Sequence, residues 1–223
     1  EVAAWSPEEF VRRVVVDALH AKAVVVGANF RFGSRAAGDV HTLVEQGADH
    51  DFVAEGIALD AGPMVWSSTY VRTCLAAGDV AGAAEALGHP YAVRGVVVKG
   101  DQRGRTIGFP TANVQVGEQH VLPADGVYVC HATVAGQRYG AVTNVGLRPT
   151  FGGLRRTVET YLLDFTDDIY GEVLKVELLH RLRGEQKFAG VAALVAQITA
   201  DVAAARAWLR SVCPISARSA EIG

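Results

Sequence analysis

A glycine-rich loop carries the residue types best suited to phosphate chemistry. The stretch 100–113 reads Gly-Asp-Gln-Arg-Gly-Arg-Thr-Ile-Gly-Phe-Pro-Thr-Ala-Asn, with glycines at Gly100, Gly104 and Gly108. Glycine lets the backbone approach a ligand closely, and successive N–H groups in such a loop can hold phosphate oxygens. Arg103 and Arg105 could add charge-assisted hydrogen bonds. No Gly-Lys-Ser/Thr follows, so this is not a Walker A loop, and a plain glycine-rich turn between two strands is the alternative.

Two oxygen donors close the same loop. Thr111 carries a hydroxyl and Asn113 an amide oxygen, and Pro110 before them has a fixed φ that helps to hold the site. Magnesium usually keeps several waters and takes one or two protein oxygens plus substrate phosphates, so a neutral pair suffices when the phosphates bring the negative charge. The alternative is a turn in which both side chains bond their own backbone. We predict that Thr111 and Asn113 are ligands of Mg²⁺.

Glu159 is the candidate for proton transfer. Side chains alternate along a strand, so a strand over 157–165 places Glu159 on one face with Thr157 and Tyr161. Apolar and aromatic neighbours partly desolvate a carboxylate, and phosphoryl transfer to a hydroxyl needs a group that orients the hydroxyl and accepts its proton. The alternative is a solvated glutamate at the start of a strand.

Taken together, the motifs resemble those of the riboflavin kinases and, upstream, the FMN adenylyltransferase half of the bacterial bifunctional FAD synthetases. The kinase-like motifs follow one another in the family's order, in the stretches 100–113, 122–128, 144–152, 158–165, 168–171 and 187–188. The stretches 29–33 (Asn-Phe-Arg-Phe-Gly) and 67–72 (Ser-Ser-Thr-Tyr-Val-Arg) resemble the adenylyltransferase half. The resemblance covers nearly the whole chain, from about residue 5 to residue 212.

The resemblance implies a transferase of flavin cofactor biosynthesis. Its kinase would transfer the γ-phosphate of ATP to the 5′-hydroxyl of riboflavin, giving FMN and ADP, with Glu159 as base, Mg²⁺ as cofactor and ATP as co-substrate. The expected nucleotide-binding residues are Gly100, Arg103, Gly104, Arg105, Gly108, Phe109 and Pro110. A flavin-binding or flavin-sensing module without turnover is one alternative. A general nucleotide-binding scaffold, with no selective affinity for riboflavin, is another.

The upstream motifs imply what remains of an adenylyltransferase module, which would convert FMN to FAD in the complete protein. In the resembling family the Ser-Thr-x-x-Arg set, here Ser68, Thr69 and Arg72, touches nucleotide phosphates; an N-cap beside an exposed arginine is the alternative. Asn29 and Arg31 follow a predicted strand, where open α/β sheets bind ligands, although they could simply cap a loop. The family's His-x-Gly-His motif does not occur in this sequence. We therefore expect this module to be truncated, so that the chain forms FMN but little or no FAD.

The pattern of elements predicts two domains. Residues 1–88 alternate helical and strand-like segments, which predicts part of a doubly wound, Rossmann-like α/β nucleotidyltransferase. Gly88-His89-Pro90-Tyr91 marks the boundary. Residues 89–223 would form the riboflavin kinase domain, an antiparallel β-barrel with a C-terminal amphipathic helix over 191–209. Its strands are expected at 92–99, 126–134, 138–145, 157–165 and 173–181, with a hairpin turn at 135–137.

Composition excludes several other classes. The 223 residues are 50% hydrophobic with a net charge of −3, which gives no general attraction to nucleic acid or to an anionic membrane. No apolar run approaches 18 residues, and no signal peptide is visible. Cys74, Cys130 and Cys213 form no Cys-x-x-Cys pair, which indicates reduced thiols and a cytoplasmic protein. The oligomeric state, a homo-oligomer included, is left open.

Overall fold

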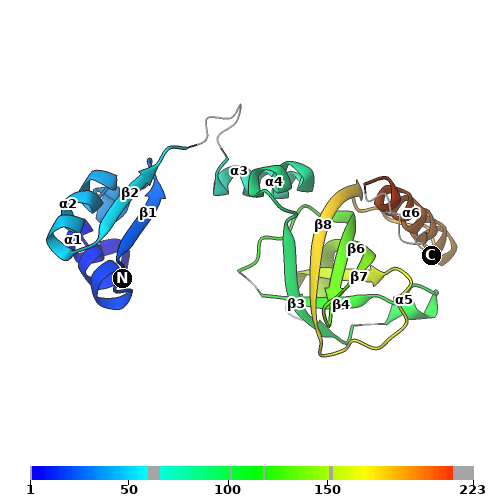
Figure 1. Ribbon diagram of the computed structural model, residues 1–223. Coiled ribbons are helices and arrows are strands. Elements are labelled where there is room, and N and C mark those ends of the chain that lie inside the picture. The colour runs from blue at the N-terminus through cyan, green and yellow to red at the C-terminus, as the bar shows by residue number, and fades with distance from the viewer. Residues whose placement is uncertain (1, 60–65, 101, 118, 151–152, 213–223) are drawn as a thin grey trace, which may run out of the picture. The chain divides into compact units, whose positions relative to one another are not determined.

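The computed structural model describes residues 2–59, 66–100, 102–117, 119–150 and 153–212 (Figure 1). By their internal packing these residues form two compact units, one that ends at Val65 and one that begins at Trp66. Each unit is described by itself below.

The first unit is a small α/β layer. Two parallel strands, β1 and β2, carry helices on one face; the elements are η1 (Val2–Ala4), α1 (Pro7–Phe10), its π-helical continuation η2 (Val11–Ala18), β1 (Ala23–Gly27), η3 (Ser34–Ala36), α2 (Val40–His50) and β2 (Val53–Ile57). Its buried core consists of Val11, Val15, Phe32, Leu43 and Phe52. On the outer face of the strands, Val25 and Val53 are exposed. The unit agrees with the predicted partial α/β module.

Local signals explain where these helices begin. The hydroxyl of Ser6 accepts a hydrogen bond from the Glu9 amide at 3.1 Å, and Pro7 takes the first helical position, as the sequence predicts. Asp39 caps α2 through the amide of Thr42, whose hydroxyl in turn bonds the Asp39 amide. This reciprocal pair satisfies two amides that the helix itself cannot.

The second unit is built on a closed antiparallel barrel with the strand order β3-β4-β7-β6-β5-β8. The strands are β3 (Ala92–Val98), β4 (Ala112–Val116), β5 (Gly126–Val134), β6 (Gln137–Thr150), β7 (Gly153–Leu162) and β8 (Val173–Arg183). Closure removes the unpaired edges that an open sheet would expose. The barrel confirms the predicted antiparallel fold of this half of the chain.

Three details differ from the sequence prediction. β4 and the short helix α5 (Arg103–Thr106) lie where the sequence indicated only a loop, because Gly and Pro turn signals surround a strand of five residues. The hairpin turn holds two residues rather than three. Ala135 and Gly136 both have positive φ, and Gln137 already pairs with Val134. Positive φ at both positions is the geometry that joins twisted strands tightly.

The barrel interior combines apolar packing with a few satisfied polar groups. Tyr128, Cys130, Thr143 and Thr160 are fully buried there. The hydroxyl oxygens of Thr143 and Thr160 lie 3.0 Å apart, and the two residues are direct register partners on β6 and β7. Burial raises the pKa of the Cys130 thiol to about 12. The hydroxyls of Thr143 and Thr160 therefore satisfy each other in the barrel interior, where a hydroxyl without a hydrogen bond would destabilise the fold.

Helices α3 (Ser68–Ala77) and α4 (Val80–Leu87) pack against the barrel. Leu75, Val80 and Ala83 share one buried core with barrel side chains, and Figure 1 shows both helices beside the ends of β3 and β8. By packing, therefore, the boundary between the compact units falls at 65/66 and not at the predicted 88/89. The sequence signal at 88–91 marks the end of α4, where Gly88 adopts the left-handed conformation. The assignment of residues 66–88 to the adenylyltransferase module stays a prediction.

Helix α6 (Val191–Val212) lies against the side of the barrel. Ala205 and Val202 pack with Val127, Val129 and Val142 from the strands. The carboxylate of Asp164 receives two hydrogen bonds from Arg206, each 2.7 Å long. Within the described part of the chain, α6 is the one helix long and apolar enough to cross a membrane by length and composition. Its packing here is that of the covering helix that the sequence predicts.

Candidate functional site

Three strands place Glu159 between two amide side chains. Glu159 on β7 is the register partner of Asn113 on β4 and of Asn144 on β6. Its neighbours Val158 and Thr160 are buried in the barrel interior, so alternation turns Glu159 to the outside of the wall. There it is half-buried in a pocket beneath α6. The sequence predicted Glu159 as the base; the structure puts it in a cavity.

The cavity beneath α6, which we call the α6 pocket, has a volume of about 360 Å³ and mainly apolar and aromatic walls. Phe109 from the glycine loop packs edge-on against Tyr161 of β7, with ring centroids 5.5 Å apart. Further walls come from Val127, Val142, Phe188, Leu194, Ile198 and Val202. Most small-molecule sites have this composition, with a few polar groups placed among apolar walls.

A nearly buried ion pair lies in the same pocket. Arg183, at the end of β8, donates to both carboxylate oxygens of Asp201 on α6, with distances from 2.7 to 3.1 Å. The two side chains are only 16% and 8% exposed. Gln197 adds a hydrogen bond of 2.9 Å to Asp201. The sequence analysis missed this pair, although an acidic residue between Ile198 and Val202 on the apolar stripe of a helix was a signal that could have revealed it.

The glycine loop folds back on itself at two glycines, Gly104 and Gly100. A Cβ on Gly104 would lie 2.3 Å from the carbonyl oxygen of Phe109, whose amide donates to the Gly104 carbonyl at 2.8 Å. A Cβ on Gly100 would lie 2.4 Å from the amide nitrogen of Asn113. The first close contact seats the ring of Phe109 in the α6 pocket, and the second holds Asn113 beside the loop.

A second cavity, the loop pocket, also borders the glycine loop. It is lined by Gln102, Arg105, Pro110, Thr111, Thr166, Asp167, Asp168, Tyr170 and apolar neighbours. Thr111 lines both this pocket and the α6 pocket. Of the other predicted nucleotide-binding residues, Arg105 and Pro110 face the loop pocket, whereas Gly104 and Phe109 face the α6 pocket. The backbone of Arg103 begins α5, and its side chain lies outside the described residues.

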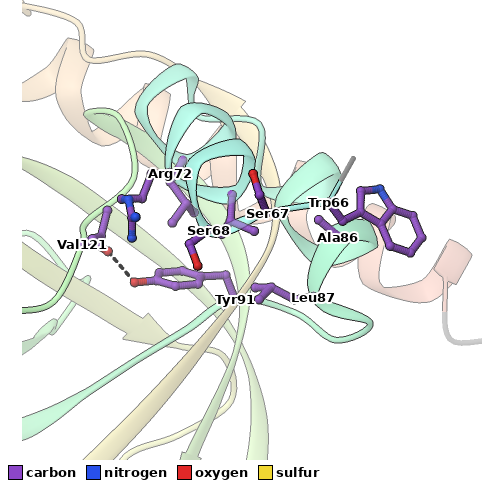
Figure 2. A pocket seen from close by; sticks show the side chains of 10 residues that line it. Trp66, Ser67, Ser68, Arg72, Ala86, Leu87, Tyr91 and Val121 are labelled. Carbon is purple, nitrogen blue, oxygen red and sulfur yellow. Dashed lines mark hydrogen bonds between the residues drawn. The ribbon is translucent and has the colours of Figure 1, made fainter. Parts of the chain in front are cut away.

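A third cavity lies at the start of α3 (Figure 2). It is lined by Trp66, Ser67, Ser68, Val71, Arg72, Leu75, Ala86, Leu87, Tyr91 and Val121. Ser67 rather than Ser68 caps the helix, by accepting from the Tyr70 amide at 3.1 Å. The Tyr91 hydroxyl donates to the Val121 carbonyl at 2.7 Å and fixes one wall. Ser68 and Arg72, predicted to contact phosphates, therefore share one cavity. The backbone carbonyl of Thr69 accepts a hydrogen bond from the Thr73 hydroxyl at 3.0 Å.

Asn29 and Arg31 lie in the other compact unit, on the segment that follows β1. Arg31 donates to Asp39 at 2.8 Å, so its guanidinium supports the cap of α2. Asn29 is exposed. The alternative weighed from the sequence, a residue that supports a loop or cap, accounts for the position of Arg31.

Comparison with known proteins identifies the family. A sequence model of the family described as riboflavin kinase matches residues 87–209, more than half of the chain. The chain belongs to the riboflavin kinase family. A second model, described as FAD synthetase, matches residues 1–62. The family match spans the whole barrel and most of α6, so it contains both pockets that meet at Thr111.

Individual relatives agree with this assignment. The chain is 41% identical over 206 residues to the bifunctional riboflavin kinase/FMN adenylyltransferase of Escherichia coli, an alignment that covers 92% of this chain and 66% of that protein. It is 37% identical to the protein of the same name from Bacillus subtilis, with coverages of 89% and 64%. A crystal structure described as a macrolide-efflux protein from Streptococcus pneumoniae is 36% identical, with a TM-score of 0.79 over 92% of this chain and 66% of that one. The chain thus spans about two thirds of the length of these relatives.

Proposed function

We propose that this chain phosphorylates riboflavin to FMN at the point where its two barrel pockets meet. The observation that carries the proposal is that Thr111 lines both the α6 pocket and the loop pocket. Two substrates bound in adjoining cavities could therefore meet at one residue. Glu159 lines the α6 pocket and pairs in register with Asn113, only two residues along the chain from Thr111.

Riboflavin would occupy the α6 pocket. Its flat isoalloxazine ring suits the apolar and aromatic walls, among them Phe109, Tyr161 and Phe188. The ion pair of Arg183 and Asp201 offers both donors and acceptors to the polar edge of such a ring. The ribityl chain would then extend toward Glu159, which places the 5′-hydroxyl near the carboxylate.

ATP would occupy the loop pocket. Arg105 supplies positive charge there, and Gly108, with a φ of +88°, turns the backbone between Arg105 and Pro110, which line the pocket. Thr111, which lines this pocket, and Asn113, two residues along the chain, are the neutral oxygen donors that we assign to Mg²⁺, which when bound would neutralise charge on the phosphates. Their neutral character fits a magnesium ion that takes most of its negative ligands from ATP.

Chemistry follows from the position of Glu159. Its carboxylate would orient the 5′-hydroxyl of riboflavin and accept the proton as the oxygen attacks the γ-phosphorus. A bond forms between the ribityl oxygen and the γ-phosphorus, and the bond from that phosphorus to the bridging oxygen of ADP breaks.

We further propose that the complete protein is a cytoplasmic bifunctional enzyme that also adenylylates FMN to FAD. The names of the relatives and the match of residues 1–62 support this part. Ser68 and Arg72, which share the α3 cavity, and Asn29 are the residues that we assign to that second activity.

The test is incubation of the chain with riboflavin, ATP and Mg²⁺, followed by separation of flavins and nucleotides. We expect FMN and ADP in equal amounts. Riboflavin binding without ADP release would favour a flavin-sensing module instead. Nucleotide binding without riboflavin affinity would favour the scaffold alternative.

A further inference from the structure

Two arginines two positions apart on β8 point to opposite faces of the barrel wall. In a regular strand, residues i and i+2 share a face. Here Arg181 is the register partner of Tyr128 and Arg183 that of Val127, so a β-bulge leaves Leu182 as the extra residue. Tyr128 belongs to the interior core, whereas Val127 packs under α6. The bulge therefore turns Arg183 toward the α6 pocket, as bulges beside functional sites often re-aim a side chain.

The guanidinium of Arg181 donates hydrogen bonds to two backbone carbonyls outside β8. It donates to the carbonyl of Ala77, at the end of α3, at 3.1 Å. It also donates to the carbonyl of Asp125, just before β5, at 2.8 Å. The planar fork of an arginine can bridge two carbonyls in this way, and the compact ammonium of a lysine cannot match it.

The seat of Arg181 is made by two glycines. A Cβ on Gly78 would lie 2.8 Å from three atoms of the Arg181 side chain, and a Cβ on Gly126 would lie 3.1 Å from its Nε. That Nε is buried and has no hydrogen-bond partner among the described residues. Such a group costs free energy, so the two carbonyl bonds must compensate for it. The guanidinium is thus wedged between the end of α3 and the start of β5.

We propose that Arg181 is a positioning residue for the flavin pocket. By tying the end of α3 to the start of β5, it holds the bulge of β8 that directs Arg183 to Asp201. This inference rests on the proposed function, because it assigns riboflavin to the α6 pocket. It also gives α3 and α4 a role in the kinase: the helix pair that carries Ser68 and Arg72 is an anchor for the flavin site.

The experiment compares three variants of the full chain by steady-state kinetics. Arg181→Met removes both bonds. Gly78→Ala crowds the same guanidinium from the α3 side without changing β8, and because it also strains the left-handed backbone at Gly78, where φ is +78°, its melting temperature is measured with its kinetics. Arg94→Met is the matched control, since Arg94 is an exposed arginine on β3 that lines neither pocket. Riboflavin affinity is measured in parallel by quenching of flavin fluorescence, below the melting temperature of each variant.

We expect the KM and Kd for riboflavin to rise about tenfold in Arg181→Met and Gly78→Ala, the effect of misaligning one charged hydrogen-bonded pair. The KM for ATP should stay unchanged, and Arg94→Met should behave as the parent. Unchanged riboflavin constants in both variants would overturn the inference. So would a loss of kcat alone, which reports a smaller folded fraction. If the parent chain itself neither binds nor phosphorylates riboflavin, it is the proposed function that fails.

Discussion

Asn113 and Glu159 are direct register partners across the ladder between β4 and β7. The pairing brings the predicted metal ligand and the predicted base to the same level of the barrel wall, although 45 residues separate them in the sequence. Backbone pairing fixes this relationship more firmly than two mobile loops could. A one-residue slip of β7 would turn Glu159 into the barrel interior.

Glu159→Gln tests the base. The substitution keeps the size and hydrogen bonding of the side chain but removes its capacity to accept a proton. We expect turnover to fall by roughly 10² to 10⁴, the usual range for loss of a general base, while riboflavin and ATP still bind. Single-turnover formation of FMN measures the effect. Glu172→Gln, which changes an exposed glutamate before β8, is the control. Near-normal turnover in Glu159→Gln would refute the assignment.

Thr111→Ala and Asn113→Ala test the magnesium site. Each removes one oxygen donor, so the affinity for Mg·ATP and the turnover should fall together, while the barrel stays folded. Titration with Mg²⁺ at fixed ATP measures the shift. Thr199→Ala is the matched control, because the Thr199 hydroxyl is exposed and bonds only within α6. If both variants bind Mg·ATP as the parent does, the metal must be held elsewhere.

Variants of the Arg183–Asp201 ion pair can distinguish its effect on folding stability from its effect on riboflavin binding. Arg183→Met alone leaves the Asp201 carboxylate, only 8% exposed, without a cation and with only the hydrogen bond from Gln197, so we expect the free energy of unfolding to fall by about 3–5 kcal/mol. Arg183→Met combined with Asp201→Leu should recover most of that loss, since two apolar side chains replace a desolvated pair. Riboflavin affinity should stay low in both.

Urea unfolding and fluorescence titration of the same samples distinguish these effects. The exposed pair of Arg206 and Asp164 is the comparison; breaking it should lower the free energy of unfolding far less, because solvent screens an exposed pair. Full recovery of riboflavin binding in the double variant would show that the pair serves stability alone.

His131 makes the barrel sensitive to mild acid. Burial, with the Arg138 guanidinium beside it, lowers the pKa of His131 below its ordinary 6.5. The unfolded chain therefore binds more protons than the folded one as the pH falls through 6.5, and the free energy of unfolding falls with it. His131→Gln should flatten this dependence in urea unfolding between about pH 7 and pH 5. His120→Gln, on an exposed loop, is the control; an unchanged slope in His131→Gln would contradict the prediction.

The sequence predicted those parts of the site that local chemistry specifies. Gly104, Thr111 and Glu159 have residue types and neighbours that favour a phosphate loop, an oxygen donor and a base, and the structure places all three around one pocket. The helix start at Ser6 could likewise be predicted, because a cap depends on a few adjacent residues. The resemblance to riboflavin kinases supplied the roles that residue types alone leave open.

What the sequence did not reveal depends on register and long-range contact. Arg183 and Asp201 are 18 residues apart and meet only because α6 folds over the barrel. The opposite orientation of Arg181 depends on a bulge, for which the strand pattern of β8 gives no warning. The packing of α3 and α4 onto the barrel likewise depends on a surface formed by distant strands, so the sequence placed a boundary at the end of α4 instead.

Because Cys130 is completely buried, the rate at which its thiol is chemically modified measures how often the barrel opens. Only a thiolate reacts readily with alkylating reagents, and a thiol with a pKa of about 12 inside a closed barrel supplies almost none. Modification of this thiol therefore requires that the barrel opens first. Cys74 on α3, buried against the same core, would report release of the helix pair. With Cys213 replaced, the relative labelling rates of the two sulfurs would reveal whether helices and barrel come apart in one step or two.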